Sequence, residues 1–195
     1  MRKKAKEVPK KDLGSRKLKS LLTRMKKLLK KEELGVAIAA PQVGESLRIF
    51  VIAGKVFESS SRQEPPHSSE NGLAERSEKN REPFREGEAA NVPHDRVFVN
   101  PEITRHSRRK LEMSEGCLSI PGKYGTVLRH ERVSLKALDE QGRSVSHNAI
   151  GLLAHIFQHE CDHLDGILYT DKTIKLEEDE NIGSAREKLK EKHNI

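Results

Sequence analysis

The residues best suited to chemistry are the histidines and glutamate of an HExxH motif in the segment 158–163 (QHECDH). His159 and His163 are four residues apart, so a helix over 151–166 places both imidazoles on one face. Two such histidines can bind one metal ion, and Glu160 between them is placed to take a proton from a water molecule on that metal. The alternative is an amphipathic core helix that carries two histidines without a metal. HExxH in a helical context favours the metal site.

The third metal ligand has to come from elsewhere in the chain, because catalytic sites of this kind use three protein ligands and leave the fourth position to water. Tyr169 stands where metzincin proteases have their third histidine. The glutamates at 177–178 lie in a charged tail with no apolar run to bury them. The ligand is therefore expected upstream of the motif.

Two cysteines are available as thiol ligands. Cys117 lies in a short, turn-prone segment, 115–122 (EGCLSIPG). Cys161 lies inside the HExxH motif, but two positions after His159 its side chain points to the opposite face of the helix. A lone cysteine is more often a small buried hydrophobe than a ligand. The missing third ligand nevertheless makes Cys117 the better choice.

The composition limits the class of protein. The chain has 195 residues, enough for one domain, and its hydrophobic and charged fractions are both 34%, with no Trp. So lean a composition predicts that part of the chain stays outside the core. The net charge of +7 suggests a polyanionic neighbour such as RNA, with a solvated basic surface as the alternative. Two cysteines make no disulfide framework, which predicts a cytoplasmic protein, and no apolar run suits a membrane span or a signal peptide.

Several elements are needed to position these residues. The basic stretch 1–14 is expected to be loose or extended. Ser15 can cap a helix that runs to about Leu34 with one apolar stripe. Small residues at 35–44 (GVAIAAPQVG) allow another backbone to approach closely. The run 47–53 (LRIFVIA) predicts a buried strand.

The composition changes at 58–95, which is rich in Ser, Glu, Pro, Asn and Arg and has no sustained period. We interpret this segment as a disordered or weakly ordered insertion within a single domain that spans 1–195. A strand then resumes at 96–100 (RVFVN) and is expected to end at Pro101.

The last third of the chain alternates in the way that strands do. The stretches 124–138 and 143–149 predict a hairpin around 139–142 (DEQG). A charged tail is expected from about residue 172, with a short basic helix at 185–193.

Three stretches, in order, resemble the motifs of peptide deformylases: 35–42 (GVAIAAPQ), 115–119 (EGCLS) and 158–164 (QHECDHL). Together with the leading helix and the hairpin, the similarity covers nearly the whole chain outside 58–95 and the C-terminal end. The resemblance implies an α+β fold, in which small mixed or antiparallel β-sheets surround a central helix that carries HExxH, with an N-terminal helix. Each motif supplies a part of the site that the other two lack.

The resemblance also implies a set of metal ligands and a reaction. In that family the Cys of the second motif and both His of the third hold the metal, hence Cys117, His159 and His163 here. Glu160 would deprotonate the water on the metal, and the hydroxide would attack the formyl carbon of an N-formyl-methionyl peptide. Glu160 would then pass its proton to the departing amine, and formate would be released.

The oxyanion formed in this reaction would be met by the metal, the side-chain amide of Gln42 and the backbone N–H of Leu118. The metal of that family is typically Fe(II), with Ni, Co or Zn as substitutes. Ligand softness alone would favour zinc, so the identity of the metal stays open.

The resemblance further implies a substrate site. Positions that match the family's side-chain pocket or its peptide-pairing backbone are Val36, Ala37, Gly116, Leu152, His155 and Ile156. Among these, Leu152 and Ile156 suit a methionine side chain. His155 lies one turn before His159 and could intrude on the metal. The alternative is a histidine that borders the pocket or supports a metal ligand from behind. Three ligands and a water already fill such a site, which favours this alternative.

The expected partners are N-formyl-methionyl nascent peptides and the surface of the ribosome, with no membrane, and the chain is expected to act as a monomer. The main alternative is a catalytically idle binding module on the same scaffold, associated with the ribosome or RNA. An idle relative is expected to have lost Glu160, Cys117 or a histidine of the motif, and this chain keeps them all. A third option is a related hydrolase that acts on a different acyl or peptide substrate.

Overall fold

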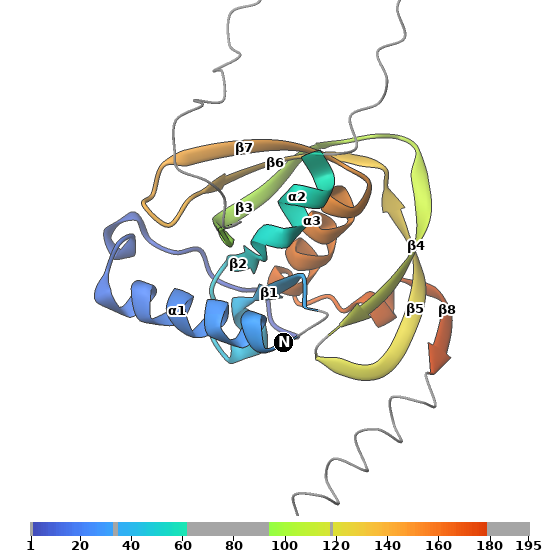
Figure 1. The fold of residues 1–195 in the computed structure, drawn as a ribbon, viewed down its shortest axis with the longest axis horizontal. Coiled ribbons are helices and arrows are strands. Elements are labelled where there is room, and N and C mark those ends of the chain that lie inside the picture. Colours follow the sequence, from blue (N-terminus) through green and yellow to red (C-terminus); the bar gives the residue numbers. More distant parts are fainter. Residues whose placement is uncertain (1, 33–34, 62–93, 118, 179–195) are drawn as a thin grey trace, which may run out of the picture.

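The computed structural model describes residues 2–32, 35–61, 94–117 and 119–178. These residues form two antiparallel sheets, in the strand orders β1-β2-β3-β6-β7 and β4-β5-β8, with the helix α3 between them (Figure 1). The strands are β1 (Ala37–Ala39), β2 (Ile49–Ile52), β3 (Arg96–His106), β4 (Lys110–Cys117), β5 (Ile120–His130), β6 (Arg132–Leu138), β7 (Ser144–Ile150) and β8 (Thr173–Glu178). The helices are α1 (Arg16–Lys31), α2 (Gly54–Ser61) and α3 (Gly151–Leu164), with short 3-10 turns at Lys10–Asp12, Ala40–Val43 and Tyr169–Asp171. The expected α+β fold around a helix that carries HExxH is confirmed.

The N-terminal helix α1 begins where the sequence predicts it. The Ser15 side chain accepts a hydrogen bond from the backbone N–H of Leu18 at 3.2 Å, which caps the helix. The apolar stripe is buried against one face of the five-stranded sheet through Leu18, Leu21, Leu22, Met25 and Leu29. Leu28, which the sequence also assigned to the stripe, is instead 38% exposed. The helix ends at Lys31, three residues before the predicted end.

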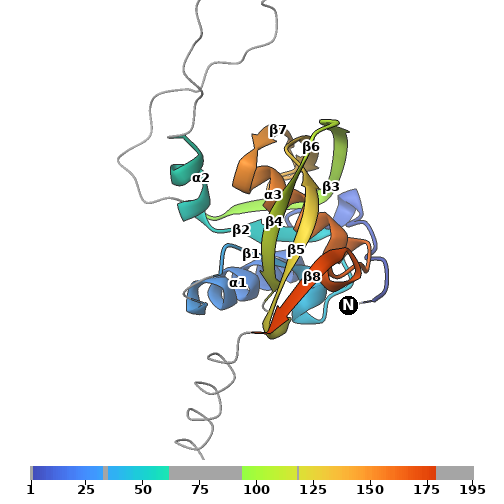
Figure 2. The ribbon, with the colours of Figure 1, turned by 90° about the vertical axis from the view of Figure 1, so that its right-hand side faces the viewer.

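The strand β2 has a helix on each side. Ile49 and Val51 belong to the cluster under α1, whereas Phe50 and Ile52 pack with α3. Because side chains alternate along a strand, a run with all four residues buried needs cover on both faces of the sheet. The buried strand predicted at 47–53 is confirmed, and α1 and α3 lie on opposite faces of the sheet (Figure 2).

The prediction that Pro101 ends its strand is wrong. The register of β3 against β6 shifts between Val99 and Glu102, and Asn100 has a positive φ of 49°. Such a bulge tolerates a residue without a backbone N–H, so the strand passes through the proline and continues to His106.

The hairpin predicted around 139–142 is confirmed, with β6 paired to β7. Its first arm is shorter than predicted, because the stretch 124–138 is divided at Glu131. The residues before Glu131 belong to β5 in the three-stranded sheet, and those after it belong to β6 in the five-stranded sheet.

The ends of two other predicted segments differ from the structure. The charged tail expected from 172 begins as the strand β8, which pairs with β5. The helix α2 extends into the start of the insertion predicted at 58–95. The rest of that insertion and the helix predicted at 185–193 lie outside the described residues.

The N-terminal segment is extended, as expected, and it connects separate parts of the fold. The backbone N–H of Ala5 donates to the carbonyl of Leu164 at the end of α3, at 2.7 Å. Lys6 forms an isolated parallel bridge with Leu47, just before β2. Ala5 and Val8 are buried. In the part of the chain that the structure describes, no helix is long and apolar enough to cross a membrane.

Candidate metal centre

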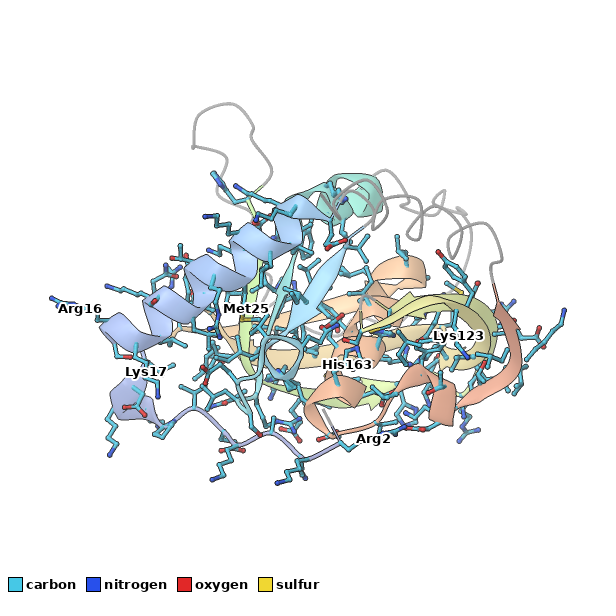
Figure 3. The ribbon with its side chains drawn as sticks, turned by 90° about the horizontal axis from the view of Figure 1, so that it is seen from below. Arg2, Arg16, Lys17, Met25, Lys123 and His163 are labelled. Carbon is cyan, nitrogen blue, oxygen red and sulfur yellow. The ribbon has the colours of Figure 1, made fainter. Side chains whose placement is uncertain are left out.

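The three side chains predicted as metal ligands converge at one point. The helix α3 brings His159 and His163 from adjacent turns, with ring centroids 4.6 Å apart. Cys117 ends β4, where the register against β5 shifts after Gly116. The Sγ atom of Cys117 lies 3.2 Å from Nε2 of His163, and the ligand atoms of the three residues all lie within 4.8 Å of one another. His163, which is labelled in Figure 3, is almost fully buried, at 1% exposed.

This donor set fits one divalent metal ion. Bonds of about 2.1 Å to nitrogen and about 2.3 Å to sulfur place two ligands of a tetrahedral ion about 3.6 Å apart. The distance of 3.2 Å between Sγ of Cys117 and Nε2 of His163 is close to this spacing. A thiolate and two imidazoles are also ligand types that suit divalent transition metals. The other thiol, Cys161, is buried and lies outside this cluster, in agreement with the sequence analysis.

A buried carboxylate orients one of the ligands. Oε2 of Glu115 lies 2.6 Å from Nδ1 of His159, so the Nε2 atom of that ring is left for a metal. The other oxygen, Oε1, lies 2.7 Å from Nε2 of His155. Arg129 donates to both oxygens, from Nε at 2.6 Å and from Nη2 at 3.1 Å. Each oxygen of Glu115 therefore has two nitrogen partners.

Arg129 extends this network to Asp162, a third residue of α3. Its Nη1 donates to Oδ2 of Asp162 at 2.6 Å, and Lys172 donates to Oδ1 of the same carboxylate. The side chains of Arg129 and Glu115 are almost fully buried, at 4% and 1% exposed. Burial alone would raise the pKa of Glu115, but the hydrogen bonds from His155, His159 and Arg129 hold it well below its usual range. The carboxylate therefore stays ionised and keeps accepting from His159.

The two histidines of the motif differ in electrostatic environment. Burial, together with the charge on His159, lowers the pKa of His163 to about 3, so this ring is neutral and ready to bind a metal. Burial would also lower the pKa of His159, but hydrogen bonds to Cys117 and Glu115 raise it to about 10. Without a metal this ring holds an extra proton, which metal binding has to release.

Glu160 has the features of a general base. Its side chain is buried, and among the described residues its Oε2 has no hydrogen-bond partner. Burial raises the pKa of Glu160 to about 7, although His159 acts to lower it. A carboxyl group with a pKa near neutrality can both take and return a proton at working pH.

Gln42 joins the site from the turn after β1. Its Oε1 accepts from the backbone N–H of Ala39 at 2.7 Å, which fixes the orientation of the amide. Its Nε2 donates to Ser119 Oγ at 3.1 Å and to Cys117 Sγ at 3.5 Å. The amide N–H is therefore held beside the metal ligands. Leu118, which was predicted to offer a backbone N–H here, lies outside the described residues.

The residues expected to bind substrate fall into two groups. Ala37 lies on β1 and Gly116 on β4, which are the edge strands of their sheets among the described residues. Edge strands have backbone groups available for an extended peptide. The second group comprises Leu152, His155 and Ile156, in the first half of α3, and Val36, which packs against the hydrophobic cluster that contains Ile156. Within it, Leu152 is 46% exposed, whereas Ile156 and His155 are buried.

Three contributors to the site were given no role from the sequence: Glu115, Arg129 and Ser119. Glu115 lies within the second motif, and its role appears only when β4 is placed beside His159. Arg129 lies on a strand with no motif around it, and its two acidic partners are 14 and 33 residues away. Ser119 lies within the second motif but has no recognisable role until Gln42 is placed beside it. The role of Arg129 depends on strand register, which no local pattern shows. The motif in which Ser119 lies could have indicated the role of that residue.

Known proteins are similar to this chain in both sequence and fold. Residues 1–179 match the polypeptide deformylase family. A peptide deformylase of Dictyoglomus turgidum is 38% identical over 172 residues, which cover 88% of this chain and 85% of the relative. One of Treponema pallidum is 36% identical over 148 residues, or 76% of this chain and 68% of the relative.

Solved structures agree with this assignment. A class I type b peptide deformylase of Acinetobacter baumannii, solved with bound Met-Ala-Ser, superimposes with a TM-score of 0.65 at 33% identity. The match covers 88% of this chain and 90% of that structure. Motifs, fold and relatives lead to the same conclusion: this chain belongs to the peptide deformylase family.

Proposed function

We propose that this chain removes the formyl group from the N-terminal formyl-methionine of nascent polypeptides and releases formate. The observation that carries the proposal is the convergence of Cys117, His159 and His163 beside a buried glutamate with an unpartnered oxygen. The family membership supports the same reaction. The Acinetobacter baumannii relative was solved with bound Met-Ala-Ser, which has the form of a deformylated product.

Cys117, His159 and His163 would hold one divalent metal ion. When bound, such an ion supplies Lewis acidity, which acidifies water and polarises the formyl oxygen. We propose Fe(II) from the family resemblance, with Zn, Ni and Co as alternatives that the same ligands accept. Glu115 keeps His159 in the orientation and tautomer that leave Nε2 directed to the ion.

Glu160 would act first as a base and then as an acid. It takes a proton from the attacking water while the water oxygen bonds to the formyl carbon. As the carbon–nitrogen bond breaks, Glu160 returns this proton to the amine nitrogen, so that formate and a free amino terminus result. The pKa of about 7 produced by burial suits both transfers.

Gln42 would stabilise the negative charge that develops on the formyl oxygen. Its Nε2 is already held next to Cys117, and a donor fixed in place before reaction is effective in a buried site. The backbone N–H of Leu118 is proposed as the second donor. The edges of β1 at Ala37 and of β4 at Gly116 would pair with the peptide, and Val36, Leu152 and Ile156 would contact the methionine side chain.

We further propose that the chain is one catalytic domain that works as a cytoplasmic monomer and meets nascent chains at the surface of the ribosome. The two hydrophobic clusters support a single domain, because they share the five-stranded sheet as their common wall.

The test is release of formate from formyl-Met-Ala-Ser, measured anaerobically on protein of known metal content. We expect stoichiometric metal and rapid release of formate. If metal-loaded, folded protein released none, the idle binding module would be the correct description. If a different acyl peptide reacted much faster, the proposed substrate would be wrong.

A further inference from the structure

The charge of this chain is concentrated at its N-terminal end. Residues 1–31 contain fourteen Lys or Arg and two acidic residues, a formal charge of +12. The whole chain carries +7, so the other 164 residues together carry −5. The excess of positive charge therefore lies in the N-terminal segment, whereas the rest of the chain has a net negative charge.

The helix α1 presents this charge on a single face. It contains eight Lys or Arg and no acidic residue, and its apolar stripe faces the sheet. Figure 3 shows Met25 on the inner side of α1 and Arg16 directed away from the body of the protein. Two of the cations are paired, Arg24 with Glu45 at 3.5 Å and Lys26 with Glu140 at 2.8 Å. Six have no acidic partner among the described residues: Arg16, Lys17, Lys19, Lys27, Lys30 and Lys31.

The N-terminal segment extends the basic surface beside α1. A hollow of about 560 Å³ is lined both by residues 8–12 and by the first half of α1, so the two segments lie side by side. Inside the hollow, Asp12 and Glu45 accompany Lys17 and Arg24, so its charge is balanced. Apart from Lys17, the unpaired cations of α1 do not line this hollow and form an outer ridge, which suits an extended polyanion better than a small anion in a pocket.

The structure of α1 distinguishes between two extended polyanions, a lipid surface and a nucleic acid. A helix that binds a lipid surface inserts its apolar face into the membrane. Here that face is occupied, because Leu18, Met25 and Leu29 are 4% exposed or less. What remains on the surface is a row of charges about 24 Å long, the length of a helix of 16 residues. Over a length of this size, a nucleic-acid backbone presents several phosphates.

We propose that the N-terminal basic surface, residues 2–31, binds RNA through its phosphate backbone. Eleven of its fourteen cations are lysines, and residues 1–31 contain no aromatic side chain to stack on bases. Binding is therefore independent of RNA sequence and strongly dependent on salt. The inference deepens the proposed ribosome contact by naming its surface, and it does not depend on hydrolysis. Because α1 and α3 cover opposite faces of the sheet, bound RNA leaves the metal centre open.

The experiment measures binding of the full chain to a short, labelled RNA hairpin by fluorescence anisotropy, over about 50 to 200 mM salt. The test variant combines Lys19→Gln, Lys27→Gln and Lys30→Gln, which are exposed and keep helix propensity. The matched control combines Arg105→Gln, Arg108→Gln and Lys110→Gln, which are exposed at the end of β3 and the start of β4. Both variants lower the net charge by the same amount.

We expect the α1 variant to bind RNA about 10- to 100-fold more weakly and with a shallower salt dependence, and the control to change affinity by less than about threefold. Equal losses in both variants would overturn the proposal, since binding would then follow net charge alone. Tighter binding to vesicles of anionic lipid than to RNA would also overturn it. Formate release from a short peptide should be the same in the α1 variant and in the wild type, so this test and that of the proposed function can fail separately.

Discussion

His155 and Glu115 form a buried pair, with Nε2 of the histidine 2.7 Å from Oε1 of the carboxylate. The other oxygen of this carboxylate lies 2.6 Å from the metal-ligand candidate His159. Since the two histidines are one helical turn apart, a single glutamate of β4 contacts adjacent turns of α3. His155 thereby holds the carboxylate in the position from which it orients His159. The sequence favoured a residue at the pocket rim or behind a metal ligand over one that contacts the metal, and the geometry points to the position behind a ligand.

Replacing His155 with Leu should weaken metal binding by about 10- to 100-fold, the usual effect of removing a partner that orients a ligand. The variant His155→Gln keeps an N–H donor and should recover part of the loss. Metal retention against increasing chelator measures both. Leu152→Ala, on the exposed side of the same helix, should retain metal as the wild type does. Unchanged retention in His155→Leu would show that Glu115 needs no help from this residue.

Arg129→Met should lower the free energy of unfolding by about 3–5 kcal/mol, because it leaves two carboxylates, Glu115 and Asp162, without their buried partner. Chemical denaturation of the metal-free protein measures this loss. Arg143→Met is the matched control, since that arginine is 75% exposed and pairs with Asp139 at the surface. It should change the stability by less than about 1 kcal/mol. Equal effects of the two substitutions would contradict the structural role of the buried network.

The candidate metal ligands, which the structure brings together, could be chosen from the sequence because their signal is local. The spacing of His159 and His163 on a helix, and the turn-prone surroundings of Cys117, depend on neighbours in the chain. Arg129 carried no such signal, because its role arises when β4 and β5 pair and bring it next to Glu115. The same holds for His155, whose partner lies on another strand.

The fold shows the same division between local and distant causes. The cap at Ser15 and the hairpin at 139–142 follow from short-range rules, and both are present. The end predicted at Pro101 failed because a bulge, set by pairing with β6, accommodates the proline. The division of 124–138 at Glu131 depends on which sheet each half joins, and strand alternation alone contains no such information.

The two cysteines allow a matched test of the metal ligands. Cys117→Ser should lower the metal content of purified protein, because an alcohol replaces the thiolate ligand. Cys161→Ser should keep the metal and lose about 1–3 kcal/mol of stability, since it buries a hydroxyl group in place of a thiol. Metal analysis and thermal unfolding of both variants separate the two roles. Full metal content in Cys117→Ser would exclude that residue as a ligand.

Glu160→Gln should retain the metal and reduce kcat by at least about a hundredfold, the scale of general-base catalysis. The substitution keeps the shape of a side chain that is almost fully buried, but an amide cannot take the proton of the attacking water. KM should change little, because the lost interaction belongs to the transition state. Asp165→Asn is a suitable control, as it removes a carboxylate at the exposed end of the same helix. Formate release near the wild-type rate in Glu160→Gln would assign the proton transfer to another group. The unpartnered oxygen of Glu160 would then need a different explanation.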